Sequence, residues 1–193
     1  GEAIGDLYAP RLISVNDNGS VQVSTQNFDE WEKVGNALPT TDLGFFNQFG
    51  YGDWNLSFML RGSFGHSLLN VTRMFYEPQA LAASVYNTVV TDKYAGARDF
   101  TFSDNYIEKA GFLRLNHVTI GRTFNLKRGH SLILELIGQN LFTITSYSGN
   151  DPEARYTTAG SINSFRQAFS AGVDERSEYF TTRTYTLALR FKL

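Results

Sequence analysis

The chain ends on T-T-R-T-Y-T-L-A-L-R-F-K-L, residues Thr181–Leu193, and this stretch decides the fold class. Alternate residues in it are apolar, namely Tyr185, Leu187, Leu189, Phe191 and Leu193. Side chains of a strand point alternately to two faces, so the stretch predicts a strand with one apolar and one polar face. A long, exposed strand of this kind invites aggregation at the edge of a soluble sheet. In a membrane barrel it pairs on both sides and turns its apolar face to lipid.

Five further segments carry the signals of strands. They lie at about Gly5–Ser14, Leu43–Tyr51, Trp54–Phe64, Gly111–Leu126 and Ser131–Ile144. The third alternates most clearly, and its apolar face carries Trp54, Leu56, Phe58 and Leu60. Gly52-Asp53 predicts a tight turn, so the second and third segments form a hairpin. In the fourth segment the apolar positions change parity near Asn116-His117, which predicts a β-bulge or a local switch of faces.

The links between these strands alternate between short and long. The turns at Gly52-Asp53 and Lys127–His130 are short, whereas the other three links are much longer. Outer-membrane barrels show this alternation, with short periplasmic turns and long extracellular loops. The last four predicted strands also reach the roughly 9–11 residues that a tilted membrane strand needs. In the link after the third strand, Pro78 precedes a predicted short helix at Gln79–Tyr86.

Composition narrows the class of protein. The 193 residues are 15% aromatic, carry a net charge of -2 and include no cysteine. No window approaches the roughly 18 apolar residues of a membrane-spanning helix, and no basic run suggests a nucleic-acid partner. The aromatic content fits the girdles of a membrane barrel, and it also fits an aromatic core. The alternative to a barrel is therefore a soluble β-sandwich that binds carbohydrate.

Seven phrases, in order along the whole chain, resemble those of the SusC/RagA-type TonB-dependent transporters. They are Gly1–Gly5 with Tyr8, Gly35–Pro39 with Leu43–Phe45, Leu60–Gly65, Phe112–Gly121, Gly138–Thr143, Tyr147–Glu153 and Arg183–Leu189. Gly138–Thr143 reads G-Q-N-L-F-T and Tyr147–Glu153 reads Y-x-G-x-D-P-E, as in the family. The chain departs from the pattern at several positions. Ala3 and Ala37 replace prolines, an acidic loop is reduced to Asn16–Ser20, and Ala188 stands where a barrel-assembly signal often has glycine.

The resemblance implies both a fold and a function. The fold is all-β: residues 1–193 form the last six or so antiparallel strands of a 22-stranded, plugged outer-membrane barrel. The plug domain and the segment that contacts the TonB complex are expected in a longer protein, outside this chain. The implied function is energised import of a nutrient, a glycan or an oligopeptide, across the outer membrane of a Gram-negative cell. The implied partners are a SusD-like surface lipoprotein, membrane lipid, the TonB complex and the rest of the same barrel.

Motifs for catalysis or metal binding are sparse. His66, His117 and His130 have no partner at metal-ligand spacing, so no metal site is expected. The sequence contains no G-x-S-x-G elbow. Adjacent His and Ser residues in a strand would point to opposite faces, so they could not form a catalytic pair. The chain is therefore predicted to hold no cofactor and not to be an enzyme.

Three groups of residues are candidates for functional roles. The lipid-facing group is Trp54, Leu56, Phe58, Leu60, Tyr185, Leu187, Leu189, Phe191 and Leu193. The candidate lumenal charges are Arg61, Glu135 and Arg190, because charge facing lipid is costly, and Glu135 is expected either to pair with one of the two arginines or to contact the plug. The candidate ligand- or partner-facing loop residues are Tyr76, Tyr86, Tyr147 and Asp151. Aromatic rings are platforms for sugars and peptides, and packing within the loops is the alternative for each ring.

Overall fold

The computed structural model describes residues 3, 5–78, 89–98, 100–153, 172–174 and 181–192. The chain divides into two compact units. We call Thr41–Ser63, Phe112–Thr145 and Thr181–Leu193 the sheet unit, and Gly1–Thr40, Phe64–Gly111 and Ser146–Phe180 the loop unit. The long links of the sequence therefore gather into one body of their own. None of the helices in the described residues is long and apolar enough to cross a membrane.

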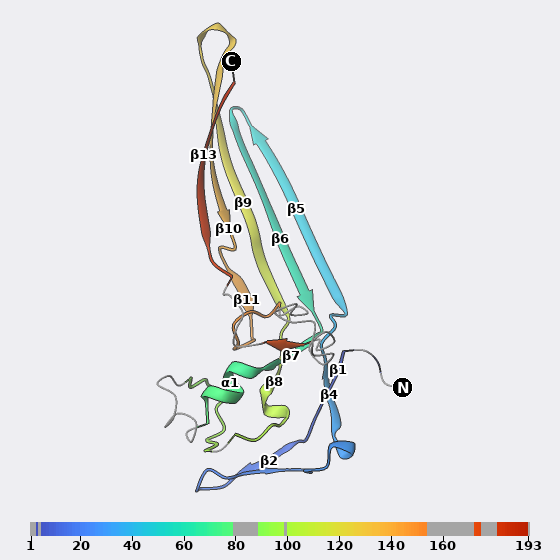
Figure 1. The fold of residues 1–193 in the computed structure, drawn as a ribbon. Coiled ribbons are helices and arrows are strands. Elements are labelled where there is room, and N and C mark those ends of the chain that lie inside the picture. Colours follow the sequence, from blue (N-terminus) through green and yellow to red (C-terminus); the bar gives the residue numbers. More distant parts are fainter. Residues whose placement is uncertain are drawn as a thin grey trace, which may run out of the picture. The chain divides into compact units, whose positions relative to one another are not determined.

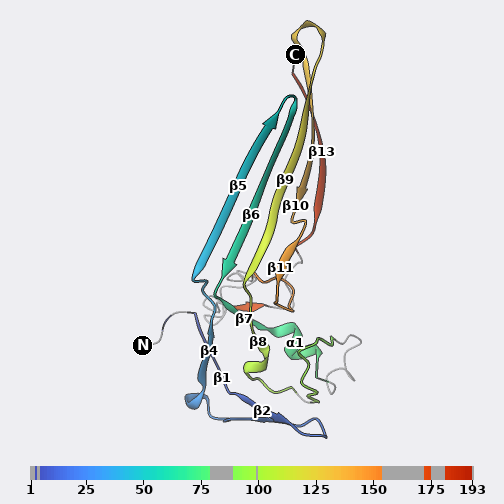
Figure 2. The ribbon, with the colours of Figure 1, turned by 180° about the vertical axis from the view of Figure 1, so that it is seen from behind.

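The sheet unit is built from five long neighbouring strands (Figure 1). They are β5 (Thr41–Tyr51), β6 (Trp54–Phe64), β9 (Phe112–Asn125), β10 (Ser131–Gln139) and β13 (Thr184–Lys192). Their order is β13-β10-β9-β6-β5, and the short β11 (Thr143–Thr145) also pairs with β9. The pairs β6–β9, β9–β10 and β10–β13 are antiparallel. Figure 2 shows the same order from behind.

The β-bulge predicted near Asn116-His117 is confirmed. Met59 lies opposite His117, but the next residue of β6, Leu60, lies opposite Leu115, so Asn116 is the extra residue. Because of this insertion, Leu115 shares a face with Val118 although their numbers differ in parity. The bulge also marks the end of β10. Asn140 has a positive φ of 52°, and its backbone N–H donates to the carbonyl oxygen of Asn116 at 3.0 Å.

The prediction that Gly5–Ser14 is one strand of the large sheet is wrong. Pro10 lacks a backbone N–H and divides the segment into β1 (Asp6–Ala9) and β2 (Leu12–Val15). β1 pairs with β4 (Glu32–Asn36), and β2 pairs with β3 (Val21–Val23). Strands of four residues are too short to cross a membrane. In the described residues the large sheet thus holds five long strands and β11, rather than six long strands.

The loop unit also contains a small three-stranded sheet and short helical turns. The sheet has the order β12-β7-β8, with β7 at Ser67–Asn70, β8 at Ile107–Lys109 and β12 at Val173–Asp174. α1 (Val71–Tyr76) follows β7, and the 3-10 turns η1 and η2 lie at Phe28–Glu30 and Asp104–Tyr106. A third 3-10 turn, η3 (Lys127–Gly129), joins β9 to β10 in the sheet unit. The helix predicted at Gln79–Tyr86 lies outside the described residues.

Candidate functional site

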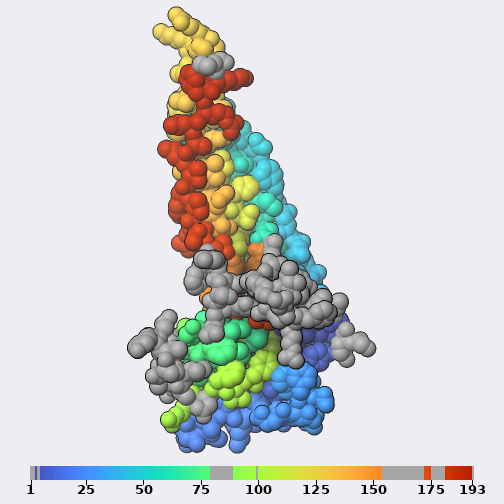
Figure 3. All heavy atoms as spheres, in the orientation of Figure 1, coloured from blue at the N-terminus to red at the C-terminus, as the bar shows by residue number. Residues whose placement is uncertain are grey.

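One face of the large sheet is apolar from β6 to β13, and we call it the apolar face. Strand register places Leu56 opposite Ile120, Ile120 opposite Leu136, and Leu136 opposite Leu187. The side chains at its β13 margin are the most open, with Leu187 65% and Leu189 67% exposed. In Figure 3 the spheres of β5 and β13 lie at opposite margins of the sheet. So large an exposed apolar surface is typical of contact with a membrane or a partner.

The predicted lipid-facing residues in the described part of the chain share this face. Trp54, Tyr185, Leu187, Leu189 and Phe191 are exposed, whereas Leu56, Phe58 and Leu60 are half-buried. Two rings of β5 explain part of this burial, since Phe45 and Phe49 each pack 6.2 Å from the ring of Phe58. Leu193 lies outside the described residues.

The opposite face of the sheet carries the polar residues, and we call it the polar face. Arg61, Glu135 and Arg190 all lie on it, as the register of β6, β9, β10 and β13 requires. Glu135 Oε2 lies 3.6 Å from Arg190 Nη2. The guanidinium of Arg61 lies instead 5.8 Å from the centre of the Phe112 ring. Of the two arginines expected as partners of Glu135, Arg190 is therefore the one that the structure places beside it.

The loop unit is organised around a buried arginine that sequence reasoning missed. Arg73 of α1 is 1% exposed. Its guanidinium donates to Oε1 of Glu77 at 3.0 Å and to Oε1 of Glu108 at 2.8 Å. It also donates to the backbone oxygens of Asn105 and Lys93, both at 3.0 Å. Burial by itself lowers the pKa of Arg73, but the hydrogen bonds with the two glutamates outweigh it and raise that pKa.

Glu108 of β8 is the second centre of this network. Its carboxylate accepts hydrogen bonds from the Ser148 hydroxyl at 2.7 Å and from Nδ2 of Asn70 at 3.0 Å, and Lys93 Nζ pairs with its other oxygen. Burial alone would raise the pKa of Glu108. The hydrogen bonds from Lys93, Arg73 and Ser148 outweigh burial and lower the pKa to about 2. The network thus ties β7, α1, β8 and the chain after Ser146 into one body.

This pKa predicts acid sensitivity of the loop unit. The pKa of Glu108 falls from 4.5 to about 2 on folding, so its ionised form contributes stability that is complete above pH 4.5 and is lost as the pH falls toward 2. Burial raises the pKa of Asp174, which acts in the opposite direction. In the complete protein, amide exchange in α1 and β8 should show protection that declines between these pH values. Glu108→Gln should remove that decline, and an equal decline in wild type and variant would contradict the prediction.

The Y-x-G-x-D-P-E phrase, Tyr147–Glu153, forms hydrogen bonds that connect separate segments of the loop unit. The Tyr147 hydroxyl donates to Oδ2 of Asp174 at 2.7 Å, and the Asn150 backbone N–H donates to the same oxygen at 2.9 Å. A Cβ at Gly149 would collide with both Tyr147 and Asp174, so the central glycine is required by this close approach. Nε2 of His66 lies 2.8 Å from the backbone oxygen of Pro152.

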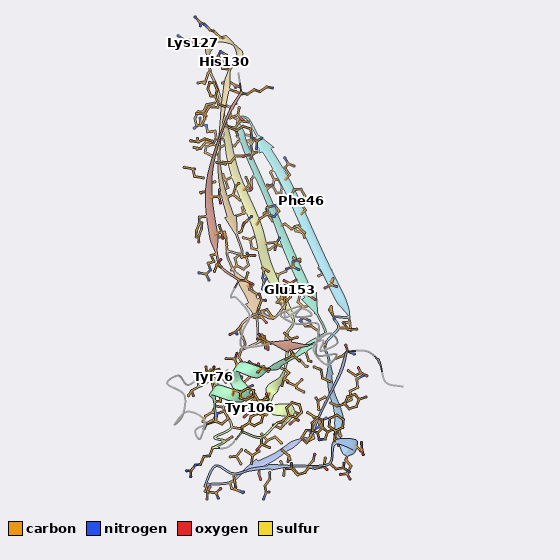
Figure 4. The ribbon with its side chains drawn as sticks, viewed as in Figure 1. Phe46, Tyr76, Tyr106, Lys127, His130 and Glu153 are labelled. Carbon is orange, nitrogen blue, oxygen red and sulfur yellow. The ribbon has the colours of Figure 1, made fainter. Side chains whose placement is uncertain are left out.

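Two of the candidate loop residues make contacts within the loop unit. Tyr147 is 6% exposed and packs in a core cluster with Leu68 and Ala110, which favours packing within the loops over contact with a ligand. Asp151 Oδ1 accepts from the Glu153 backbone N–H at 2.9 Å, which closes a local turn. Tyr76 lies at the end of α1 (Figure 4) and is half-buried, and Tyr86 lies outside the described residues.

Among the residues that the structure describes, no group of three or more His, Asp or Glu side chains could hold a metal ion. The histidines serve other contacts. His117 packs 6.2 Å from the ring of Phe46 on the polar face, and His130 packs 6.1 Å from the ring of Phe191. Arg122 is a second residue that sequence reasoning did not single out, and it lies on the apolar face near the two short turns.

Comparison with known proteins places this geometry in context. The chain is 27% identical over 201 residues to TonB-dependent receptor P3 of Formosa agariphila, covering 97% of this chain and 19% of that protein. It is 25% identical over 167 residues to TonB-dependent receptor P39 of the same organism, covering 74% of this chain and 16% of that protein. The chain therefore spans less than a fifth of the length of each of these two receptors. No family model matches it.

Solved structures show the same fold. The RagAB peptide importer in its closed-closed state aligns with a TM-score of 0.69 and 17% identity, covering 96% of this chain and 23% of that chain. The open-open state of the same importer aligns with a TM-score of 0.68 and 17% identity, covering 97% and 22%. Together with the named receptors, these matches confirm the family resemblance predicted from the seven phrases.

Proposed function

We propose that this chain is the carboxyl-terminal barrel part of a SusC/RagA-type TonB-dependent transporter, and that the complete protein imports a nutrient across the outer membrane. The observation that carries the proposal is the apolar face of the large sheet. A soluble sandwich would cover such a face with a second sheet, but Tyr185, Leu187 and Leu189 are each more than half exposed. In a membrane barrel this face meets lipid, so Trp54, Leu56 and their neighbours become the lipid-facing group.

The polar face then lines the lumen of the barrel. An ion pair such as Glu135–Arg190 is tolerated there, because lumenal charges are hydrated or face the plug instead of lipid. The margins β5 and β13 would pair with the remaining strands of the same barrel, which lie outside this chain. Energy would reach the transporter through a plug and the TonB complex, also outside this chain.

The loop unit would form part of the extracellular surface. Short turns of outer-membrane barrels face the periplasm, and long links face outward. A body held by buried ion pairs offers a fixed platform, which suits contact with a SusD-like surface lipoprotein over a substrate cavity. Because the structural relatives are described as a peptide importer, an oligopeptide is the first substrate class to test, and a glycan is the second.

Substrate uptake by cells tests this function. Cells that express the complete protein should take up fluorescent oligopeptides or glycans, and loss of its gene should reduce that uptake on the order of tenfold or more. Loss of TonB should have the same effect, because the import is energised. A strain that lacks only an unrelated transporter is the control. Unchanged uptake of both substrate classes, together with a protein that fractionates away from the outer membrane, would refute the proposal.

A further inference from the structure

Arg122 interrupts the apolar face close to one end of the sheet. It lies on β9 opposite Trp54 of β6 and Leu134 of β10. The residues of β6, β9, β10 and β13 that share this face are otherwise uncharged in the described part of the chain. The Arg122 side chain is exposed. A charge on a lipid-facing surface is unfavourable, so an arginine at this position is expected to have a compensating interaction.

Two aromatic rings hold the Arg122 guanidinium. Its central carbon lies 5.1 Å from the centre of the Trp54 ring and 4.9 Å from the centre of the Phe124 ring. Phe124 is two residues nearer the end of β9, so the side chain leans toward the short turns. Cation–π contacts stabilise the charge on the ring faces but leave edge N–H groups available to donate. Within the described residues, Arg122 forms no ion pair with a carboxylate.

The end of the sheet near Arg122 carries more positive than negative side chains. Lys127 and Arg128 lie in the turn after β9, Lys192 ends β13 on the polar face, and Asp53 is the carboxylate of the turn before β6. Figure 4 shows Lys127 and His130 at this end of the sheet. Arg122 lies three residues before the end of β9, which is about 10 Å along a strand. This depth matches the boundary between hydrocarbon and headgroups, where an arginine is tolerated far better than at the midplane.

We propose that Arg122, with Trp54 and Phe124, binds the phosphate of an anionic phospholipid in the membrane leaflet at the end of the sheet that carries the short turns. The proposal rests on the membrane placement in the proposed function. A guanidinium donates two parallel hydrogen bonds to a phosphate, which a neutral side chain cannot do. Leu134 lies beside Arg122 on the apolar face, Leu189 lies beside Leu134, and both give the acyl chains an apolar surface.

Lipid titration of the complete transporter tests the proposal. Purified protein in a neutral detergent is titrated with phosphatidylglycerol or phosphatidylcholine, and bound lipid is counted by native mass spectrometry. Arg122→Gln should weaken phosphatidylglycerol binding on the order of tenfold, the loss expected for a charge-assisted pair. Lys127→Gln is the matched control, because it removes one positive charge from the turn, outside the apolar face. It should weaken binding less than about twofold, and neither variant should alter phosphatidylcholine binding.

Each outcome decides the proposal. Unchanged phosphatidylglycerol binding by Arg122→Gln would overturn it, and so would an equal loss in Lys127→Gln, since diffuse charge would then explain the preference. Displacement of the lipid by millimolar inorganic phosphate would show a site for free phosphate instead, and would also overturn it. Heat-modifiable migration on gels confirms that each variant is folded. A wild-type protein that folds and reaches the outer membrane but prefers no lipid refutes this inference alone, whereas one absent from that membrane refutes the proposed function.

Discussion

An Arg73→Met variant of the complete protein is expected to lose about 3–5 kcal/mol of stability in the loop unit. This is the usual consequence of removing one partner of a buried ion pair. Methionine removes the cation but keeps most of the side-chain length. Glu77, whose side chain is 1% exposed, would lose its cationic partner Arg73, and its charge would be buried without a counter-charge among the described residues. The backbone oxygens of Asn105 and Lys93 would also lose their donor.

Amide hydrogen exchange measures this effect segment by segment, because local opening free energies follow from the protection of each amide. Arg11→Met is the matched control. Arg11 also pairs with two carboxylates, Glu32 and Asp104, but its side chain is 50% exposed, so its loss should cost far less stability than the loss of Arg73. Combining Arg73→Met with Glu77→Leu should restore part of the stability, since both charges are then gone. Equal protection in Arg73→Met and Arg11→Met would show that the buried pairs do not hold the unit.

Much of the large sheet could be predicted from the sequence because its signals are local. Period-two alternation gives the faces of β6 and β13 directly, and Gly52-Asp53 gives the turn between β5 and β6. A parity change can be counted along one strand, so even the bulge at Asn116 was visible. The prediction failed at Gly5–Ser14, where the strand signal is weak and Pro10 prevents a continuous ladder.

The loop unit could not be predicted in the same way, because its determinants are far apart in the sequence. Arg73 donates to the Glu108 carboxylate and to the backbone oxygen of Lys93. The hydroxyl of Ser148, from a different link, donates to Glu108 as well. No periodic pattern links these positions. Two local signals exist. The side-chain oxygen of Asn70 accepts from the Arg73 backbone N–H at 2.9 Å as the N-cap of α1, and Glu77 pairs with Arg73 at i,i+4 spacing.

The burial of Tyr147 changes the interpretation of Tyr147–Glu153. An exposed aromatic in a loop can serve a ligand, whereas a buried one with a satisfied hydroxyl serves the fold. Tyr147 is of the second kind, since its hydroxyl donates to Asp174 and its ring lies in the core with Leu68. The phrase therefore fixes the β7–β12 region, and any substrate contact of the loop unit is expected elsewhere on its surface.

Leu187→Arg should prevent stable assembly of the complete protein in the outer membrane. Leu187 lies in the middle of β13 on the apolar face, opposite Leu136, and is 65% exposed. If this face meets lipid, an arginine near the bilayer midplane costs roughly 2–4 kcal/mol. In the proposed barrel β13 lies at a margin of the sheet that pairs with the remaining strands, so the loss would also weaken the pairing that closes the barrel. The expected result is little heat-modifiable protein in the outer-membrane fraction, with degradation of the remainder.

Thr186→Arg is the matched control, because Thr186 is the neighbouring residue of the same strand and lies on the polar face opposite Ile137. An arginine there would enter the lumen, where charge is hydrated, so assembly should be close to that of wild type. The two variants have the same added charge and nearly the same position along the strand, and they differ only in the face that carries the charge. If both assembled equally well, the apolar face would not be the lipid-facing one. If Thr186→Arg alone failed, the two faces would have been assigned the wrong way round.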